Sequence, residues 1–159
     1  MTWALVFKLI HVLIAIAFVT GLIGRGVLLR RARRAARVED ARLLADAAEP
    51  FEQMAIQGST FILPAGLLAA WAEGYAFAGL TTGWILASTV ILLTMVPLVV
   101  LVFVPRGRVF DRAMEEALRA GTWTNSLRAA FDDRAVALAR RYEVVGVSII
   151  LFLMVLKPF

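Results

Sequence analysis

Two side chains near the start of the chain are of types that can do chemistry, Lys8 and His11. They lie within the apolar sequence VFKLIHVLIAIAF, and His11 is the one histidine among the 159 residues. An imidazole can ligate haem iron, exchange a proton near neutral pH, or form a structural hydrogen bond. Because the two residues are spaced i, i+3, they share a face if the segment is helical.

A carboxylate suited to contact these two side chains is Glu73. On a helix, Glu73 shares a face with small residues, which allow a neighbouring helix to approach closely. The same face carries Gly58, Ser59, Ile62, Gly66 and Ala69. If the two segments cross a membrane antiparallel, Glu73 lies at the level of Lys8. We therefore expect an intramembrane polar cluster of Lys8, His11 and Glu73, in which Glu73 contacts Lys8 or His11.

The first segment has two stripes that are suited to face neighbouring helices. The polar stripe contains Lys8, His11, Ala15, Phe18, Leu22 and Arg25. The stripe of small residues contains Ala17, Gly21 and Gly24. The two stripes lie about a third of a turn apart at roughly 3.6 residues per turn. We expect each stripe to face a different neighbour.

Three roles are open for His11: a hydrogen bond across a helix interface, ligation of haem or a metal, and proton transfer. A haem iron on His11 would take a second ligand from Met154 or Met95, or would be five-coordinate. Lys8 lies near the end of its segment, so its amine can reach the membrane surface. We favour the structural hydrogen bond over the two functional roles.

The rest of the chain must hold these side chains in a membrane. Apolar residues make up 61% of the sequence, whereas soluble domains have about 45–50%. A membrane-spanning helix needs about 20 mostly apolar residues. Four candidate spans lie at about 3–29, 54–72, 84–104 and 142–157. The sequence therefore predicts an all-α integral membrane four-helix bundle with cytoplasmic helical extensions, in which residues 1–159 form a single membrane domain.

The composition also excludes several kinds of chemistry. The chain has no cysteine, which rules out disulfides, thiolate metal sites, iron–sulfur clusters and cysteine nucleophiles. It contains no P-loop, nucleotide-binding glycine fingerprint or recognisable Ser–His–Asp set. We therefore expect no catalytic residue and no metal site, and an enzyme is the less favoured interpretation.

The arginines indicate how the chain crosses the membrane. They gather in two connections, between the first and second spans and between the third and fourth. The connection EGYAFAGLTTG has none. By the positive-inside rule, both arginine-rich connections are cytoplasmic and both termini lie outside. Trp3, Trp71 and Trp84 then fall at the outer interface, where indole rings are common.

The first arginine-rich connection contains the sequence RRARRAAR, with Arg30, Arg31, Arg33 and Arg34. Near a membrane surface each basic residue contributes about 1 kcal/mol of attraction to anionic lipid heads. Nucleic-acid binding would require aromatic or groove-reading partners, and none is nearby. We expect these four arginines to bind anionic lipid heads, and we expect no nucleic-acid partner.

Helix-forming residues continue through this first connection. We expect the first helix to extend past the membrane to about Ala48. Pro50 then suits the first turn of the second helix, where a missing N–H has no cost. Within the spans, Pro64 and Pro97 are expected to cause kinks.

The second arginine-rich connection also has helical signals. The sequence FDRAMEEALRAG predicts an amphipathic helix over about 108–120, closed by Gly121. Thr124 or Asn125 is a suitable cap for the next helix. We expect that helix to run without a break into the fourth span.

The opening sequence WALVFKLIHVLIAIAFVTGLIGR resembles the first helix of a family of uncharacterised bacterial integral membrane proteins, which has a similar Lys-x-x-His motif. The resemblance extends over most of the chain as a hydropathy pattern. Trp3, Lys8 and His11 also resemble the start of the J-type protoporphyrinogen oxidases and the copper-resistance-D-like proteins. The histidine of those oxidases is implicated in haem binding, so this resemblance implies haem b at His11. Their Leu-Pro-Arg-Leu stretch is replaced here by LIGRGVLLRR.

The sequence leaves three functions open. We favour a non-catalytic scaffold or accessory subunit of a membrane assembly, whose partner is a membrane protein or a second copy of the chain. The second is a haem-b redox protein that uses His11. The third is a small transporter or proton-coupled pathway that uses Lys8, His11 and Glu73. The expected location is the bacterial cytoplasmic (inner) membrane.

Overall fold

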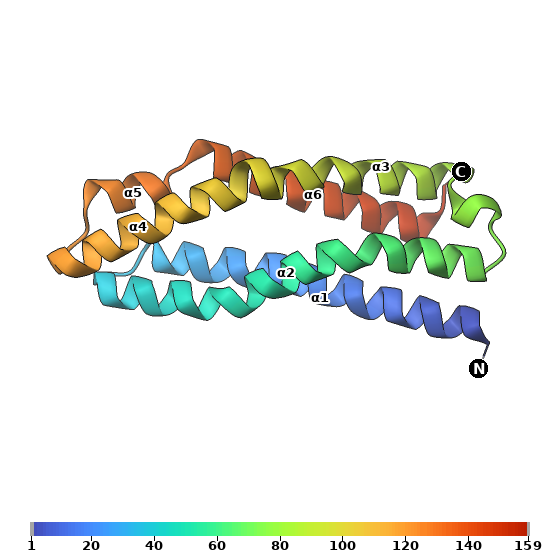
Figure 1. The fold of residues 1–159 in the computed structure, drawn as a ribbon, viewed down its shortest axis with the longest axis horizontal. Helices are drawn as coiled ribbons and strands as arrows, with labels where there is room; N and C mark the ends of the chain where they lie inside the picture. Colours follow the sequence, from blue (N-terminus) through green and yellow to red (C-terminus); the bar gives the residue numbers. More distant parts are fainter. Residues whose placement is uncertain (1, 159) are drawn as a thin grey trace.

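The computed structural model describes residues 2–158, and all regular structure in that range is helical. The helices form an elongated bundle, and both ends of the chain lie at the same end of it (Figure 1). In chain order the elements are α1 (Trp3–Ala32), α2 (Val38–Ala72), η1 (Ala76–Gly79), α3 (Gly83–Leu98), η2 (Val99–Phe103), α4 (Val104–Ala120), α5 (Asn125–Phe131) and α6 (Arg134–Leu156). We call the end near the termini the terminal end and the opposite end, with the turn at 33–37, the arginine-rich end.

The helices associate as two pairs. α1 packs along α2, and α3 packs along α6. Gly146 of α6 fits against Met95 of α3, and the hydroxyls of Thr94 and Tyr142 form a hydrogen bond of 2.5 Å between the same two helices. The bundle is therefore built from two helix pairs that meet face to face.

Three helical segments are long and apolar enough to cross a membrane: Trp3–Ala32, Val38–Ala72 and Gly83–Ala120. They contain the first three predicted spans. α6 is outside this group, because charged side chains occupy its first turns, among them Arg140, Arg141 and Glu143. The fourth span at 142–157 and the four-helix membrane bundle stay predictions.

The predicted extension of the first helix to about Ala48 is wrong. α1 ends at Ala32, and the chain reverses direction before α2 begins at Val38. The charges suit both helix ends, because Arg30 and Arg31 lie in the last turn of α1 and acidic residues lie in the first turn of α2. The reversal also buries Ala32 and Val38 in one core, which a single straight helix would leave exposed.

The placement of Pro50 at a helix start is wrong for the same reason. Because α2 begins at Val38, Pro50 lies inside the helix, as Pro64 does. Neither proline can donate an i→i−4 hydrogen bond. Pro97 precedes the π-helical turn η2, which joins α3 directly to α4. The predicted third span and the predicted amphipathic helix are therefore parts of one continuous helical segment. It ends at Gly121, which has the left-handed conformation (φ 64°), as expected.

The predicted unbroken helix after Thr124 is also wrong. Thr124 does cap α5, and its Oγ1 accepts a hydrogen bond of 3.2 Å from the Leu127 amide. The helix then stops at Phe131, and Asp133 caps α6. Its Oδ1 accepts hydrogen bonds of 2.8 Å from the Ala135 amide and 3.2 Å from the Val136 amide. A second cap, overlooked in the sequence, is the reason for the break.

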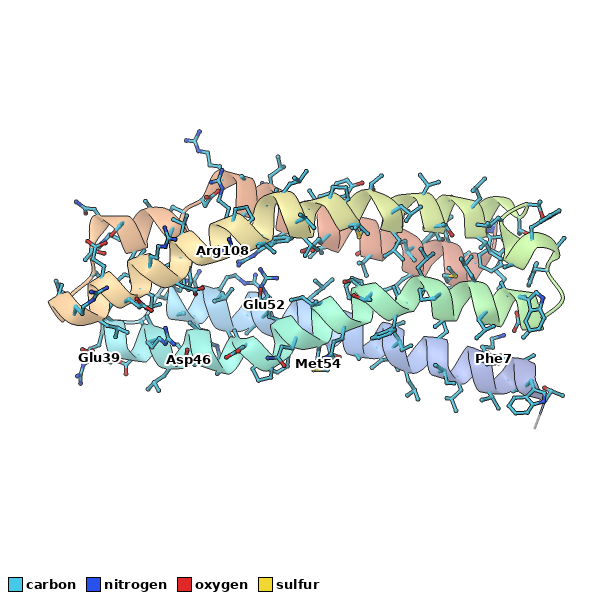
Figure 2. All side chains as sticks on the ribbon, viewed as in Figure 1. Phe7, Glu39, Asp46, Glu52, Met54 and Arg108 are labelled. Atoms are coloured by element: carbon cyan, nitrogen blue, oxygen red, sulfur yellow. The ribbon has the colours of Figure 1, made fainter. Side chains whose placement is uncertain are left out.

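The buried side chains form three clusters along the bundle. At the arginine-rich end, the cluster contains Ala32, Val38, Ala41, Ala113, Met114, Ala117 and Leu127. A middle cluster of Phe18, Ala55, Met95 and Val147 joins the two helix pairs. A third, at the terminal end, contains Ala70, Trp84, Ile85 and Leu153. Figure 2 shows charged side chains such as Glu39, Asp46 and Arg108 toward the arginine-rich end, whereas Phe7 lies toward the terminal end.

Candidate functional site

Lys8 and Glu73 join the terminal ends of α1 and α2. The distance from Lys8 Nζ to Glu73 Oε1 is 2.7 Å, so the pair is both hydrogen-bonded and ionic. The Lys8 side chain is 53% exposed and that of Glu73 28% exposed. Of the two predicted partners for Glu73, the structure therefore gives it Lys8. The pair lies where both charges can reach the membrane surface.

His11 lies one turn deeper, against the backbone of α2. Gly66 makes room for it: a Cβ at residue 66 would lie 2.9 Å from Cε1 and 3.2 Å from Nδ1 of the imidazole. Within residues 2–158, His11 Nδ1 is buried and has no hydrogen-bond partner. A buried nitrogen without a partner costs free energy. Nδ1 therefore makes no such bond, but the Ile62 backbone of α2 lies within hydrogen-bonding range of the ring, so the structural hydrogen bond favoured for His11 stays a prediction.

The small residues of α1 face α2. A Cβ at Gly21 would lie 2.6 Å from the backbone nitrogen of Ala55, and a side chain at Gly24 would strike the Phe51 ring. On the polar stripe, Phe18 packs on Gly58 of α2. Phe18 also belongs to the middle cluster with Met95 and Val147 of the other helix pair. The stripe of small residues therefore serves the close α1–α2 interface, whereas the polar stripe lies between α2 and the second helix pair.

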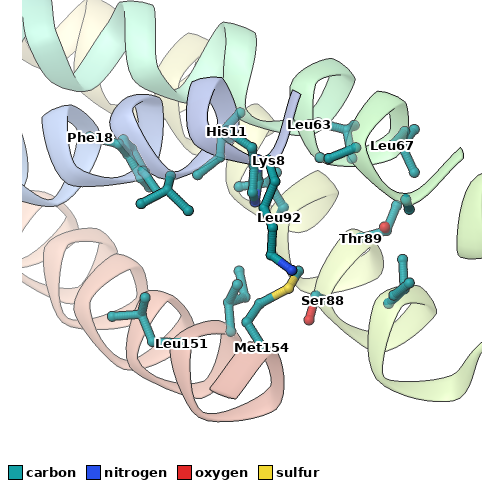
Figure 3. A pocket seen from close by; sticks show the side chains of 18 of the residues that line it. Lys8, His11, Phe18, Leu63, Leu67, Ser88, Thr89, Leu92, Leu151 and Met154 are labelled. Atoms are coloured by element: carbon teal, nitrogen blue, oxygen red, sulfur yellow. The ribbon is translucent and has the colours of Figure 1, made fainter. Parts of the chain in front are cut away.

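A cavity of about 520 Å³ lies between the two helix pairs, on the terminal side of the middle cluster. We call it the membrane cavity. Its wall is mostly apolar and comes from α1, α2, α3 and α6, and includes Val12, Ile16, Leu63, Leu92, Leu151 and Met154. Figure 3 shows His11, Leu63, Leu92 and Met154 around this space. Its polar lining includes Lys8, His11, Glu73, Ser88 and Lys157.

The haem group implied by the sequence resemblance would have to bind in this membrane cavity. His11 and Met154 both line it, whereas Met95 is buried in the middle cluster beside Gly146. The residue types in the lining are therefore those that a haem site needs. His11 and Met154 would hold the iron, and Lys8 and Lys157 would pair with the propionates. A haem held by imidazole and thioether supplies one-electron redox chemistry.

A second group of ionisable residues lies beyond the middle cluster, and the sequence reasoning missed it. Arg25 of α1 has a side chain only 12% exposed, 3.8 Å from Glu52, and its guanidinium lies 4.9 Å from the centre of the Phe103 ring. Arg140 and the buried Glu143 of α6 lie within electrostatic range of this pair. Buried charges require opposite charges nearby. Here one ion pair joins α1 to α2, and Arg140 and Glu143 bring two further charges of α6 close to it.

The four arginines expected to bind lipid heads have different surroundings. Arg33 forms an ion pair with Asp132, and Arg30 Nε donates to the Gly26 carbonyl at 3.1 Å. Arg31 and Arg34 are exposed. All four lie where α1 ends, so an anionic surface beside this turn would meet several positive charges. Their binding to lipid stays a prediction.

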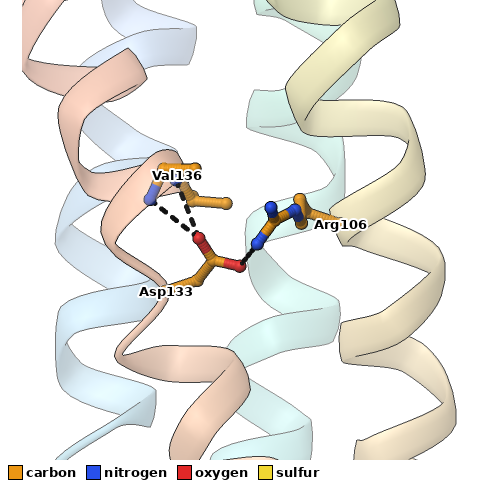
Figure 4. A network of polar contacts seen from close by, with 4 residues as sticks. Arg106, Asp133 and Val136 are labelled. Carbon is orange, nitrogen blue, oxygen red and sulfur yellow. Dashed lines mark hydrogen bonds and ion pairs between the residues drawn. The ribbon is translucent and has the colours of Figure 1, made fainter.

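Asp133 is the best-connected charge at the arginine-rich end (Figure 4). Besides capping α6, its carboxylate forms an ion pair with Arg106 of α4. Burial opposes ionisation, but the hydrogen bonds from Arg106 and from the amides of Val136 and Ala135 hold the pKa of Asp133 below its usual range. Asp133 therefore links α4 to α6. Within residues 2–158, no group of three or more His, Cys, Asp or Glu side chains is arranged to hold a metal ion.

Long apolar helices, an interior with few charges and an arginine-rich end define an integral membrane protein of the all-helical class. The sequence matches the model of a family described as "Predicted integral membrane protein (DUF2269)" over residues 5–158. The chain belongs to this family. No curated protein and no solved structure matches it.

Proposed function

We propose that the protein is a non-catalytic scaffold or accessory subunit of a larger assembly in the bacterial cytoplasmic membrane, with its arginine-rich end in the cytoplasm. The observation that carries the proposal is the core at that end, where Met114 is 1% exposed and Ala117 and Leu127 are fully buried. This core holds α4, α5 and the start of α2 in one arrangement. A surface held rigid in advance loses less entropy when it binds a partner.

The ionisable residues between the helices support a structural role. Lys8 pairs with Glu73 between α1 and α2. Farther along the same interface, Arg25 lies near Glu52 and over the Phe103 ring. Within a bilayer the hydrophobic effect does not drive helices together, since lipid is as apolar as the helices themselves. These charged contacts therefore contribute to holding the helices together.

Exposed apolar side chains at the arginine-rich end are where we expect the partner to bind. Leu43 of α2 is 67% exposed, Val109 of α4 56% and Leu138 of α6 69%. All three lie outside the predicted spans and among charged neighbours. Apolar side chains enclosed by a polar rim are typical of protein interfaces. The partner is a membrane protein or a second copy of this chain.

Photo-crosslinking in native membranes tests this function. A photoreactive amino acid replaces Leu43, Val109 or Leu138 in turn, and the same replacement at Leu13, which is 55% exposed in the terminal half, is the control. We expect a discrete protein adduct from at least one exposed position and none from the control. The mass of the adduct distinguishes a second copy from a different protein. The proposal would be contradicted if the protein were a monomer in mild detergent and none of the three exposed positions gave an adduct.

A further inference from the structure

We propose that the membrane cavity binds one anionic phospholipid, with an acyl chain inside it and the phosphate near Lys8 and Lys157. This site does not rest on the accessory role, and either proposal can fail alone. Pockets for small molecules typically measure about 300–1,000 Å³, with apolar walls and a few polar groups. At about 520 Å³, with polar side chains such as Lys8 and Glu73 in its lining, the membrane cavity has this character.

The length of the cavity matches an acyl chain. Its wall extends along α1 from Lys8 to Thr20, which is about 18 Å at the rise of an α-helix. One leaflet of a bilayer contributes about 15 Å of hydrocarbon, half of the total thickness. The middle cluster, with Phe18 and Val147, closes the far end. A chain that starts at the membrane surface would therefore fill the cavity along its length.

The cavity also has a side that faces hydrocarbon. Val12 and Ile16 of α1 and Leu151 of α6 line it, and the same three side chains are 44%, 57% and 45% exposed. The wall between α1 and α6 is therefore also part of the surface that lipid covers. An acyl chain can enter from the bilayer through this side without crossing water.

The charges at the terminal end favour an anionic head group. Lys8 and Lys157 both line the cavity there, and Glu73 is the carboxylate in its lining. Glu73 already pairs with Lys8. The Lys157 ammonium lies 5.3 Å from the centre of the Trp84 ring and has no carboxylate partner within residues 2–158. Counted over residues 2–158, Lys8, Lys157 and Glu73 thus give the entrance one net positive charge.

Native mass spectrometry of the full-length protein tests the site. The protein is delipidated in mild detergent and given equal amounts of phosphatidylglycerol and phosphatidylcholine with identical acyl chains. We expect one phospholipid per chain, with phosphatidylglycerol retained about fivefold over phosphatidylcholine. Both lipids carry a phosphate, but only the phosphatidylglycerol head group has a net negative charge to attract one lysine. Equal retention of the two lipids would overturn the proposal.

Two variants and one control test the acyl-chain site and the head-group site separately. Ala15→Phe places a ring in the cavity, whereas Leu13→Phe changes a side chain on the lipid-covered face of the same helix. We expect Ala15→Phe to abolish retention and Leu13→Phe to leave it unchanged. Lys157→Gln lies at the exposed end of α6, so it keeps the packing and tests the head group even if Ala15→Phe fails to fold. It is expected to remove the preference for phosphatidylglycerol while one lipid still binds.

Haem is the competing occupant of the membrane cavity, and an absorbance spectrum of the purified protein detects it. Absorbance of protein from haem-replete cells would show a Soret band that His11→Ala removes if haem filled the cavity. That result would overturn the lipid site. Equal lipid retention by the Ala15→Phe and Leu13→Phe proteins would overturn it as well, because the lipid would then be bound elsewhere.

Discussion

The arginine-rich end and the terminal half of the bundle are stabilised in different ways. At the arginine-rich end, α1, α2, α4 and α5 enclose a core in which Leu127 and Ala117 are fully buried. In the terminal half, α1 and α2 are drawn together by glycines and an ion pair. A cavity of about 520 Å³ lies between this pair and the pair of α3 and α6, although Ala70 of α2 still packs against both helices at the terminal end. One chain thus combines a close-packed extension with an open interior.

This difference follows from the solvent of each region. Outside the bilayer, burial of apolar surface favours a tight core, at roughly 25 cal/mol per Å². Within hydrocarbon that driving force is absent, and helices associate through close packing and polar contacts. A gap in the terminal half therefore costs little when lipid can fill it. A gap of the same size at the arginine-rich end would not be tolerated.

The largest effect should come from removing a side chain in the close-packed core. Leu127→Ala is expected to lower the free energy of unfolding by about 2–5 kcal/mol, because the buried side chain leaves a void. Leu63→Ala, in the wall of the cavity, is the matched control and should cost less than about 1 kcal/mol, since few atoms contact it on that side. Denaturant unfolding in detergent measures both. Equal losses would show that the two regions are packed alike.

The next largest effect should come from the glycines of α1. A Cβ at Gly21 would lie 2.6 Å from the Phe51 carbonyl oxygen, whereas nothing lies within 4 Å of one at Gly26. We expect Gly21→Ala to cost about 1–3 kcal/mol, because α1 and α2 must move apart. Gly26→Ala should instead stabilise the helix by up to about 1 kcal/mol. If thermal melts show the same sign for both variants, close approach at Gly21 does not hold the pair together.

A smaller effect is expected at Asp133, which connects α4 and α6. Asp133→Ala should cost about 1 kcal/mol through loss of the cap, whereas Asp132→Ala, which removes only an exposed ion pair with Arg33, should cost little. Because the folded pKa of Asp133 is lowered, its stabilisation is complete above the unfolded pKa. The difference between wild type and variant should therefore shrink as the pH falls below about 4. Melts at several pH values would refute this if the difference grew in acid.

The smallest effect should come from the ion pair between Lys8 and Glu73. A double-mutant cycle with Lys8→Gln and Glu73→Gln is expected to give a coupling of about 0.2–1 kcal/mol, because both side chains are partly exposed. Added salt should weaken the coupling. A coupling of several kcal/mol would mean that this pair, rather than the glycine interface, holds the terminal half together.

The sequence predicts the helices and several of their ends, because these features depend on local patterns. The apolar runs locate the first three spans, and Gly121 and Thr124 mark the helix boundaries that the structure has. The reversal after Ala32 was missed, because the residues on both sides of it favour a helix, so helix propensity does not show where the first helix ends. The deciding factor is the burial of Ala32 and Val38 in a shared core, which is not local.

The candidate site was predictable only in part, for the same physical reason. Helical spacing brings Glu73 to the level of Lys8, and the structure pairs them. The membrane cavity depends on how far the two helix pairs stand apart, which no single helix determines. Arg140 and Glu143 lie at the edge of a predicted span, where charged residues are ordinary. The burial of Glu143 and the partial burial of Arg140 near Arg25 follow only from the packing of α6 on the other helices.

We place the close-packed arginine-rich core in the cytoplasm and the charged entrance of the cavity outside. Cysteine labelling tests this topology directly. The chain has no cysteine, so single variants Thr81→Cys, between η1 and α3, and Arg119→Cys, on α4, give clean signals. We predict that a membrane-impermeant maleimide labels Thr81→Cys in intact cells and Arg119→Cys only after permeabilisation. Labelling of Arg119→Cys alone in intact cells would contradict the account.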